Sequence, residues 1–428
     1  GPVGADVPLS GSETARFAKR VTVDGRTSAA VQAACERAAK EGIAVVFVPA
    51  GEYVFETEVR VPGGLTLLGE GSRTLIRTKG SDTHLFSVDG DLVRFTRLKL
   101  QGAEATLSED NDSYGISAYG KQNVRIDHCE LLGFSYATTF GSEATAQLDH
   151  CAVHHNLREG LGYGVALYSG AYVLVTDNEF SQNRHSLASN GTLDWSSPKT
   201  AGKYLHKPGR KTHWEFLHNR VGSSDQSRYE LCSVDTHPGM DGSFVVAGNL
   251  FENLRHGVGI RDGAGLIESN LFRNLRTATG FRPVLGISIA YGEHNGIPVD
   301  GCMPRDIAVR ENVFLMPPGT KFEKCSVGKA ENVTVEGKLV PATKVERAAP
   351  PALIRLQEMG EDGVLNWREV PLALPGTGSV AGLVTDESGK PVAGATVFIG
   401  ERTATTDASG RFAFAEVSEA ARFVAVSK

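Results

Sequence analysis

One pattern recurs through the middle of this chain: an apolar residue, two variable residues, an Asn or Cys, one variable residue and another apolar residue. The closest repeats are 22 residues apart, at Cys129 and Cys151, and 21 apart, at Asn249 and Asn270. Such an interval holds short strands and turns, so equivalent residues stack about one strand spacing, roughly 4.8 Å, apart. The pattern therefore predicts a parallel β-solenoid. The repeated positions are Cys129, Cys151, Asn178, Asn219, Asn249, Asn270 and Asn312.

A stacked solenoid gives the recurring Asn a physical role. Each coil turns backbone N–H and C=O groups inward, and an Asn amide, with two donors and an acceptor, can bond to them and to the Asn above and below. Cys129 and Cys151 occupy the same rung, so we expect both thiols to be buried. Disulfides between these two cysteines, or between Cys302 and Cys325, require an oxidising compartment, and the spacing alone does not decide the pairing.

Composition narrows the class of protein. A length of 428 residues suits a solenoid with a small appendage, and a net charge of −6 argues against a general nucleic-acid binder. The sequence has no run of eighteen apolar residues, so it predicts no membrane-spanning helix. Residues 1–2 read as the scar of a cleaved expression tag that replaced a signal peptide. We therefore infer a secreted, periplasmic or cell-surface location from function alone, and expect a monomer or small homo-oligomer.

The N-terminal segment predicts a cap for the solenoid. Val23–Ser28 leads into an Ala-rich helix near residues 29–39, followed by strands and Gly-rich turns at Val45–Tyr53 and Leu65–Gly71. The helix would cover the open end, where the first coil exposes core and unpaired strand edges. This order of motifs resembles the pectate-lyase-like superfamily over roughly residues 20–340. The resemblance implies an all-β, right-handed parallel β-helix, residues 3–345, that acts on polysaccharides.

The C-terminal part of the chain predicts a separate domain. The repeat stops after Ala342, and residues 346–375 read as a linker that starts with Ala348–Pro351. Residues 376–428 alternate apolar and polar residues between turns. They resemble the carboxypeptidase-regulatory-like domain, a small β-sandwich, which implies an accessory module without chemistry of its own.

Residues 358–369 within the linker resemble an EF-hand loop. Gly363 falls at the sharp-turn position and Glu369 at the bidentate position, whereas Glu358 stands where Asp is usual and Gly360 supplies no side-chain oxygen. An ordinary acidic turn is the alternative. We expect no required cofactor, with Ca²⁺ as the one possible ion, and assign no metal ligand among the site residues below.

Two Asp-Gly pairs stand eight residues before ladder asparagines: Asp241 before Asn249 and Asp262 before Asn270. On successive coils these carboxylates would lie one or two strand spacings apart, close enough to share a proton, a metal or a glycosidic bond. Asp-Gly is also a common turn sequence, so a repeated turn is the alternative.

Arg-His pairs follow two ladder asparagines. Arg184-His185 comes after Asn178, and Arg255-His256 comes after Asn249, at the same offset. A row of Arg with neighbouring His is unusual on a face that need only be soluble, although a solvated surface with acidic neighbours is the alternative.

Two insertions between coils add polar residues to the same stretch. Residues 196–211 are basic, and residues 230–241 contain His237. In an acidic chain, a local basic segment beside the arginines favours an anionic ligand, so we place the site between residues 184 and 294. The catalytic candidates are His185, His237, Asp241, His256 and Asp262. The substrate-binding candidates are Arg184, Lys203, Asp235, Arg255, Arg261, Arg282, Tyr291 and His294.

Three functions fit these groups. A uronide lyase needs a base, an Arg that neutralises the substrate carboxylate and an acid. The candidates are His185, His237 or His256 as base, Arg184, Arg255 or Arg261 as neutralising group, and Tyr291 or His256 as acid. A glycoside hydrolase would instead use Asp241 and Asp262, with Asp235 as a third carboxylate. We expect an enzyme that cleaves an acidic, uronic-acid-containing polysaccharide by β-elimination; hydrolysis and non-catalytic surface binding are the alternatives.

Overall fold

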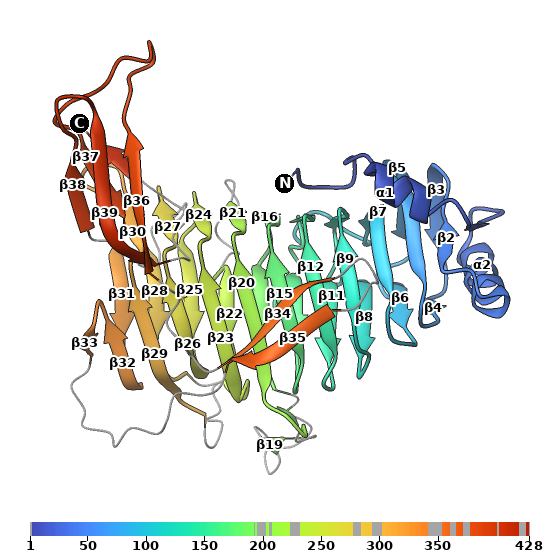
Figure 1. Ribbon diagram of the computed structural model, residues 1–428. Helices are drawn as coiled ribbons and strands as arrows, with labels where there is room; N and C mark the ends of the chain where they lie inside the picture. The colour runs from blue at the N-terminus through green and yellow to red at the C-terminus, as the bar shows by residue number, and fades with distance from the viewer. Residues whose placement is uncertain are drawn as a thin grey trace.

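The chain forms a right-handed parallel β-helix with a capping helix at one end and a small antiparallel β-sandwich beside the other, as seen in a computed structural model (Figure 1). This confirms the fold class predicted from the ladder and the N-terminal motifs. The structure describes residues 2–191, 193–194, 203–204, 208–222, 232–276, 284–292, 302–340, 353–359, 365–370, 377–399, 402–418 and 425–427.

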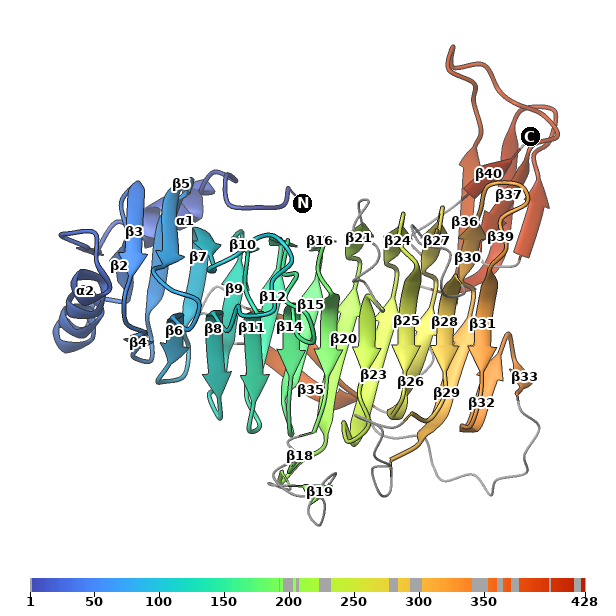
Figure 2. The same ribbon diagram turned by 180° about the vertical axis from the view of Figure 1, so that it is seen from behind.

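One face of the β-helix is a ten-stranded parallel sheet, visible through the middle of Figure 2. One strand comes from each coil, so neighbours in the sheet are distant in sequence. Its strands are β4 (Val59–Val61), β6 (His84–Val88), β8 (Tyr114–Tyr119), β11 (Tyr136–Gly141), β14 (Tyr163–Leu167), β17 (His185–Ser189), β22 (Val234–Thr236), β25 (His256–Ile260), β28 (Leu285–Ile289) and β31 (Glu323–Val327).

The other two faces are parallel rows that join through the long strands β5 (Thr66–Thr78) and β7 (Arg94–Gln101). One row adds β1 (Val21–Thr22), β2 (Val45–Phe47), β9 (Val124–Asp127), β12 (Thr145–Asp149), β15 (Tyr172–Thr176), β20 (Thr212–Leu217), β23 (Gly242–Ala247), β26 (Gly263–Glu268), β29 (Pro304–Arg310), β32 (Glu331–Val335) and the antiparallel β33 (Lys338–Leu339). The other adds β3 (Gly51–Phe55), β10 (Glu130–Leu132), β13 (Ala152–His154), β16 (Glu179–Ser181), β21 (Arg220–Gly222), β24 (Leu250–Glu252), β27 (Leu271–Arg273) and β30 (Val313–Leu315).

The predicted cap is α2 (Ser28–Glu41), which covers the first coil. The Thr27 hydroxyl accepts the N–H of Ala30, and Gly42 ends the helix in the left-handed conformation at φ 63°. Val31, Cys35 and neighbouring alanines face the core. A short helix before it, α1 (Gly11–Arg16), starts with a capping box formed by Ser10 and Glu13.

The asparagine ladder stacks as predicted. Asn249 donates its side-chain amide to the carbonyl of Phe216 at 2.8 Å and to Oδ1 of Asn270 at 2.9 Å, while its own Oδ1 accepts the backbone N–H of Asn219 at 2.8 Å. Equivalent bonds run from Cys151 through Asn178 to Asn312. Each ladder residue follows a left-handed residue that turns the corner between the two rows; these are His128, His150, Asp177, His218, Gly248, Ser269 and Glu311.

The cysteines of the ladder are buried and unpaired. Cys129 and Cys151 are fully buried, and neither forms a disulfide. His128 and His150, in the corners before them, bond through Nδ1 to the carboxylates of Asp127 and Asp149 at 2.9 Å. These histidines are part of the corner structure.

The segment expected to be a linker contains an antiparallel hairpin, β34 (Leu353–Met359) and β35 (Leu365–Val370), which lies against β15 and β20. Glu369 pairs with Ile354, whereas Glu358 stands at the far end of β34, so about four residues, or roughly 13 Å, separate the two along the hairpin. The two ends of the EF-hand-like segment therefore lie in paired strands, and calcium binding there stays a prediction. Residues 360–364 lie outside the described part of the chain.

The C-terminal sandwich has two small antiparallel sheets around Val397, Ile399, Phe414 and Val417. Phe398 points the other way and packs on Leu271 and Val313 of the β-helix. Among the described helices, none has the length and hydropathy to cross a membrane. The strands are β36 (Thr377–Leu383), β37 (Thr396–Ile399), β38 (Arg402–Thr405), β39 (Arg411–Ser418) and β40 (Ala425–Ser427).

Candidate functional site

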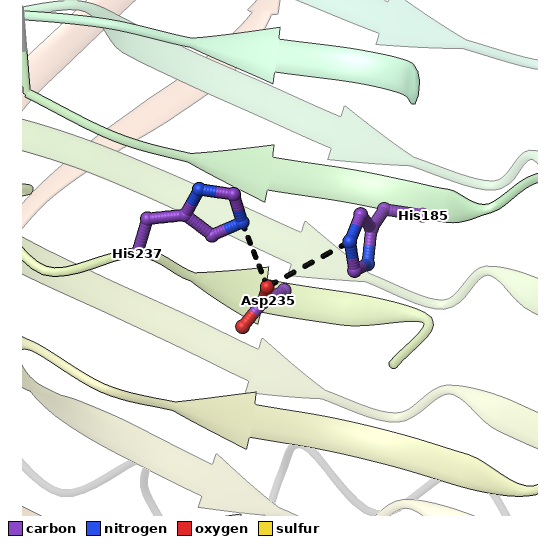
Figure 3. A group of neighbouring side chains, drawn as sticks. All are labelled: His185, Asp235 and His237. Carbon is purple, nitrogen blue, oxygen red and sulfur yellow. Dashed lines mark ion pairs between the residues drawn. The ribbon is translucent and has the colours of Figure 1, made fainter. Parts of the chain in front are cut away.

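Asp235, on β22 of the ten-stranded sheet, is the centre of a buried polar cluster (Figure 3). Its Oδ2 lies 2.8 Å from Nε2 of His237 and 3.8 Å from Nε2 of His185. The three residues are 4%, 7% and 1% exposed, respectively. Within the described part of the chain, they form the one group of three His, Cys, Asp or Glu side chains whose ligand atoms all lie within 4.8 Å of one another.

Strand register brings this cluster together. Asp235 is paired with Ala188 on β17 and with Gly259 on β25. His237 is two residues beyond Asp235, and side chains two apart on a strand lie on the same face. The backbone N–H of His237 donates to the carbonyl of Ser189 at 2.7 Å, which continues the pairing past the end of β22.

Arg261, just after β25, also holds the carboxylate of Asp235. Its Nη2 lies 2.5 Å from Oδ2, and its Nε donates to Oδ1 at 3.2 Å. Nε also lies 3.2 Å from the carbonyl oxygen of Thr236, and the Arg261 side chain remains 31% exposed. The guanidinium is therefore anchored at the cluster and still reaches solvent.

The ring of His185 has a fixed orientation. Its Nδ1 lies 2.5 Å from the carbonyl oxygen of Cys232, and a carbonyl only accepts, so Nδ1 carries the proton. Burial lowers the pKa of His185 to about 3, against the opposing charge of Asp235. The imidazole is thus neutral, with the Nε2 lone pair facing Asp235.

The pKa values of Asp235 and His237 are both below their ordinary values, for different reasons. Burial opposes ionisation of Asp235, but His237 and Arg261 outweigh it and hold its pKa well below the usual range. Burial lowers the pKa of His237, and the negative charge of Asp235 only partly offsets this. Asp235 is accordingly ionised, and its ion pair with Arg261 is the main charge interaction in the cluster.

Two predicted residues border the cluster. Arg184 precedes β17, and its Nη1 lies 3.3 Å from the Tyr163 hydroxyl. His256 begins β25; its Nε2 lies 3.0 Å from Oγ of Ser288. A Cβ on Gly259 would lie 3.5 Å from both His256 Cε1 and Asp235 Oδ1, so both side chains border Gly259. His256 is half-buried and thus more open to solvent than His185 or His237.

The two aspartates proposed as a catalytic pair do not face a common ligand. Both oxygens of Asp262 are taken by backbone N–H groups: Oδ2 by Gly239 and Asp241, and Oδ1 by Gly263 and Met303. The side chain of Asp241 points to solvent, with Oδ1 3.1 Å from Nζ of Lys211. The turn interpretation of these Asp-Gly pairs therefore describes them better, since Asp262 organises the turn that Asp241 begins.

The remaining predicted residues are Lys203, Arg255, Tyr291, Arg282 and His294. Lys203 is exposed on a two-residue strand, β19 (Lys203–Tyr204), paired with β18 (Leu193–Asp194). Arg255 is buried, 7% exposed. Tyr291 follows β28, and its neighbour Gly292 abuts the Arg261 side chain, because a Cβ there would lie 3.0 Å from Cδ. Arg282 and His294 lie outside the described residues.

Sequence reasoning missed two groups at this site. Tyr163 is paired with His185 in register, with ring centroids 5.3 Å apart, and burial raises its pKa. Lys329 places Nζ 5.2 Å from the ring centroid of Tyr291. The signal for Tyr163 was its position 22 residues before His185, one coil interval. For Lys329, no ladder spacing marks the residue.

Comparisons with known proteins agree with the fold. Residues 91–197 match the family model of the right-handed beta helix region, and residues 379–428 match that of the carboxypeptidase regulatory-like domain. Curated proteins gave no match.

Solved structures give distant likenesses. The Dettilon tailspike protein is 11% identical, with a TM-score of 0.47 over 78% of this chain and 71% of that one. The Yersinia enterocolitica family 28 exopolygalacturonase is 10% identical, with a TM-score of 0.41 over 75% and 79%. The alginate lyase from Paenibacillus sp. is 12% identical, with a TM-score of 0.38 over 75% and 99%. Likeness at this level says nothing about the reaction. The chain thus contains a right-handed β-helix region and, at its C-terminal end, a carboxypeptidase regulatory-like domain.

Proposed function

We propose that this chain is a carbohydrate-active enzyme that cleaves an acidic polysaccharide by β-elimination on the outer face of β17, β22 and β25. The observation that carries the proposal is Arg261: it is held by Asp235, yet its side chain is 31% exposed and borders Gly292, the neighbour of Tyr291. A guanidinium in a fixed position is suited to pair with the carboxylate of a uronic acid, because its planar fork matches a carboxylate.

Exposure decides which histidine acts as the base. His185 and His237 are buried against Asp235, whereas His256 is half-buried and lies at the edge of the cluster. A base must come within hydrogen-bond reach of the proton it removes. We assign that role to His256, with Ser288 as the partner that orients its ring.

The acid that we assign is Tyr291. It is half-buried next to Arg261, with the Lys329 ammonium against its ring. In the proposed step, His256 takes the proton on C5 of the uronate and the electron pair forms the C4–C5 double bond. The C4–O4 bond breaks, and the leaving oxygen takes the phenolic proton. Arg261 stabilises the charge that develops on the carboxylate during proton removal.

Hydrolysis has less support. It requires two carboxylates across the scissile bond. At the described part of this site, Asp235 is engaged by Arg261 and His237, and both oxygens of Asp262 accept backbone N–H groups.

The test is digestion of a panel of polyuronates with the full chain, following both ultraviolet absorbance of the unsaturated uronide and new reducing ends. We expect both signals to rise together. Reducing ends without ultraviolet absorbance would make the protein a hydrolase, and binding without either product would make it a carbohydrate-binding protein.

Three variants test the assigned roles. His256→Gln and Tyr291→Phe should each lower turnover by about a hundredfold or more, the usual contribution of a general acid or base. Arg261→Lys should lower turnover by a similar factor, because an ammonium lacks the planar pair of N–H donors that matches a carboxylate. The matched control is Arg220→Lys, which alters another Arg–carboxylate pair, with Glu252, on the row of β21. Full activity in Arg261→Lys would contradict the assigned site.

A further inference from the structure

We propose that His185, Asp235 and His237 bind one divalent d-block metal ion, of the Zn²⁺ class. Their ligand atoms lie within 4.8 Å of one another, and Oδ2 of Asp235 lies 2.8 Å from Nε2 of His237 and 3.8 Å from Nε2 of His185. Ligand atoms in a tetrahedral site with bonds of about 2.1 Å are roughly 3.3 Å apart. The two gaps at Asp235 therefore need shifts of about half an ångström, and the gap between the two imidazole nitrogens, at most 4.8 Å, must close to the same value.

The orientation of His185 is that of a metal ligand. Its Nδ1–H donates to the Cys232 carbonyl, which leaves the Nε2 lone pair directed at Oδ2 of Asp235. A lone pair facing a carboxylate oxygen is unfavourable without a proton or cation between them. Histidine ligands of metals commonly donate their second ring N–H to a backbone carbonyl, which fixes both tautomer and ring direction.

Arg261 has the position of an outer-shell partner. It bonds to both oxygens of Asp235, as groups that orient a ligating carboxylate do. A divalent ion would leave the cluster with positive charge, since Asp235 is its one carboxylate and Arg261 adds a cation. An anionic fourth ligand, hydroxide or a carboxylate, would offset part of that charge.

Ligand type and burial select the class of ion. Imidazole nitrogen suits Zn²⁺ and its d-block neighbours, whereas Ca²⁺ and Mg²⁺ prefer oxygen ligands. The three side chains are each less than 10% exposed, which leaves no room for a sugar ring among them and favours a small ligand.

The experiment measures metal binding on the full chain after chelator treatment and dialysis. Zn²⁺ is titrated by calorimetry, Co²⁺ by its visible d–d bands, and the melting temperature is recorded with and without each ion. We expect one equivalent to bind, intense Co²⁺ bands of a low-symmetry site and a higher melting temperature. No binding and an unchanged melting temperature would overturn the proposal, as would Ca²⁺ competing equally.

Variants locate the ion. Asp235→Asn keeps the side-chain volume and an acceptor for Arg261, and should weaken Zn²⁺ binding by at least about a hundredfold. His84→Gln is the matched control, because His84 is 41% exposed and lies 3.7 Å from Glu58, so it removes a surface His–carboxylate pair. Equal Zn²⁺ affinity in Asp235→Asn and the wild type would overturn the site. These readouts are independent of polysaccharide cleavage, so failure of the proposed reaction would leave the metal result standing.

Discussion

Gly259 faces Asp235 in the parallel pairing of β22 with β25, where an added Cβ would meet two buried side chains. A Cβ on Gly259 would lie 2.8 Å from Sγ of Cys232 and 3.5 Å from Oδ1 of Asp235. The first distance is shorter than real Cβ contacts, so even a methyl group would displace the buried thiol below the carboxylate.

Gly259→Ala should therefore disturb the packing around Asp235. We expect a loss of about 1–3 kcal/mol in the free energy of unfolding from overpacking, together with lower turnover on the polyuronate that the wild type cleaves. Gly11→Ala is the control, since a Cβ at Gly11 has no neighbour within 4 Å. Denaturant unfolding and initial rates measure the two effects. If the two alanine variants behave alike, Gly259 does not limit the packing around Asp235.

Replacing a ladder asparagine should lower the free energy of unfolding by an amount that depends on its position in the ladder. Asn249→Ala removes two donated bonds and leaves the N–H of Asn219 without its acceptor, so we expect a loss of about 2–4 kcal/mol. Asn312 accepts from Asn270 and donates only to backbone carbonyls, as the last rung. Asn312→Ala should cost less. Urea unfolding of both variants gives the comparison, and a smaller loss at Asn249 would argue against cooperative stacking.

Docking of α1 should weaken in acid. Glu13 bonds to Arg94 and Arg97 at 3.0 Å; burial opposes its ionisation, but the Ser10 N–H and both guanidiniums outweigh this and lower its pKa to about 2. A depressed carboxyl pKa contributes stability above the ordinary value of 4.5, and that stability is lost as the pH falls toward 2.

The difference in melting temperature between the wild type and Glu13→Gln isolates this effect. We expect it to be constant above about pH 5 and to shrink toward zero in stronger acid. Glu179→Gln, at an exposed position of β16, serves as the control and should show no such dependence. A difference that persists unchanged at pH 2 would mean that the ion pairs of Glu13 do not hold α1.

The C-terminal sandwich should be dispensable for turnover. It packs through Phe398 on Leu271 and Val313, on a different face from β22, and the hairpin β34–β35 lies on the row of β15 and β20. A chain that ends at Val345 should keep its activity while melting a few degrees lower, because apolar surface is uncovered. Inactivity of a folded truncation, judged by circular dichroism, would show that the site needs this domain.

The sequence by itself determined the architecture. Asn178, Asn219, Asn249 and Asn270 recur near the coil length, and a buried amide has few ways to satisfy its bonds except by stacking. The capping helix could also be predicted from the sequence, because Thr27 and Gly42 are residues that favour the start and the end of a helix. Both features depend on contacts that repeat at a fixed spacing or lie close in sequence.

Only the tertiary structure decided how the candidate residues are grouped. Asp241 and Asp262 looked equivalent by their offset from the ladder, yet one side chain points to solvent and the other accepts four backbone N–H groups. An insertion separates His185 from Asp235 in the sequence, and its length does not indicate how their two strands pair. Strand pairing at β17, β22 and β25 sets these distances, and it depends on which coil each residue joins, which spacing alone does not specify.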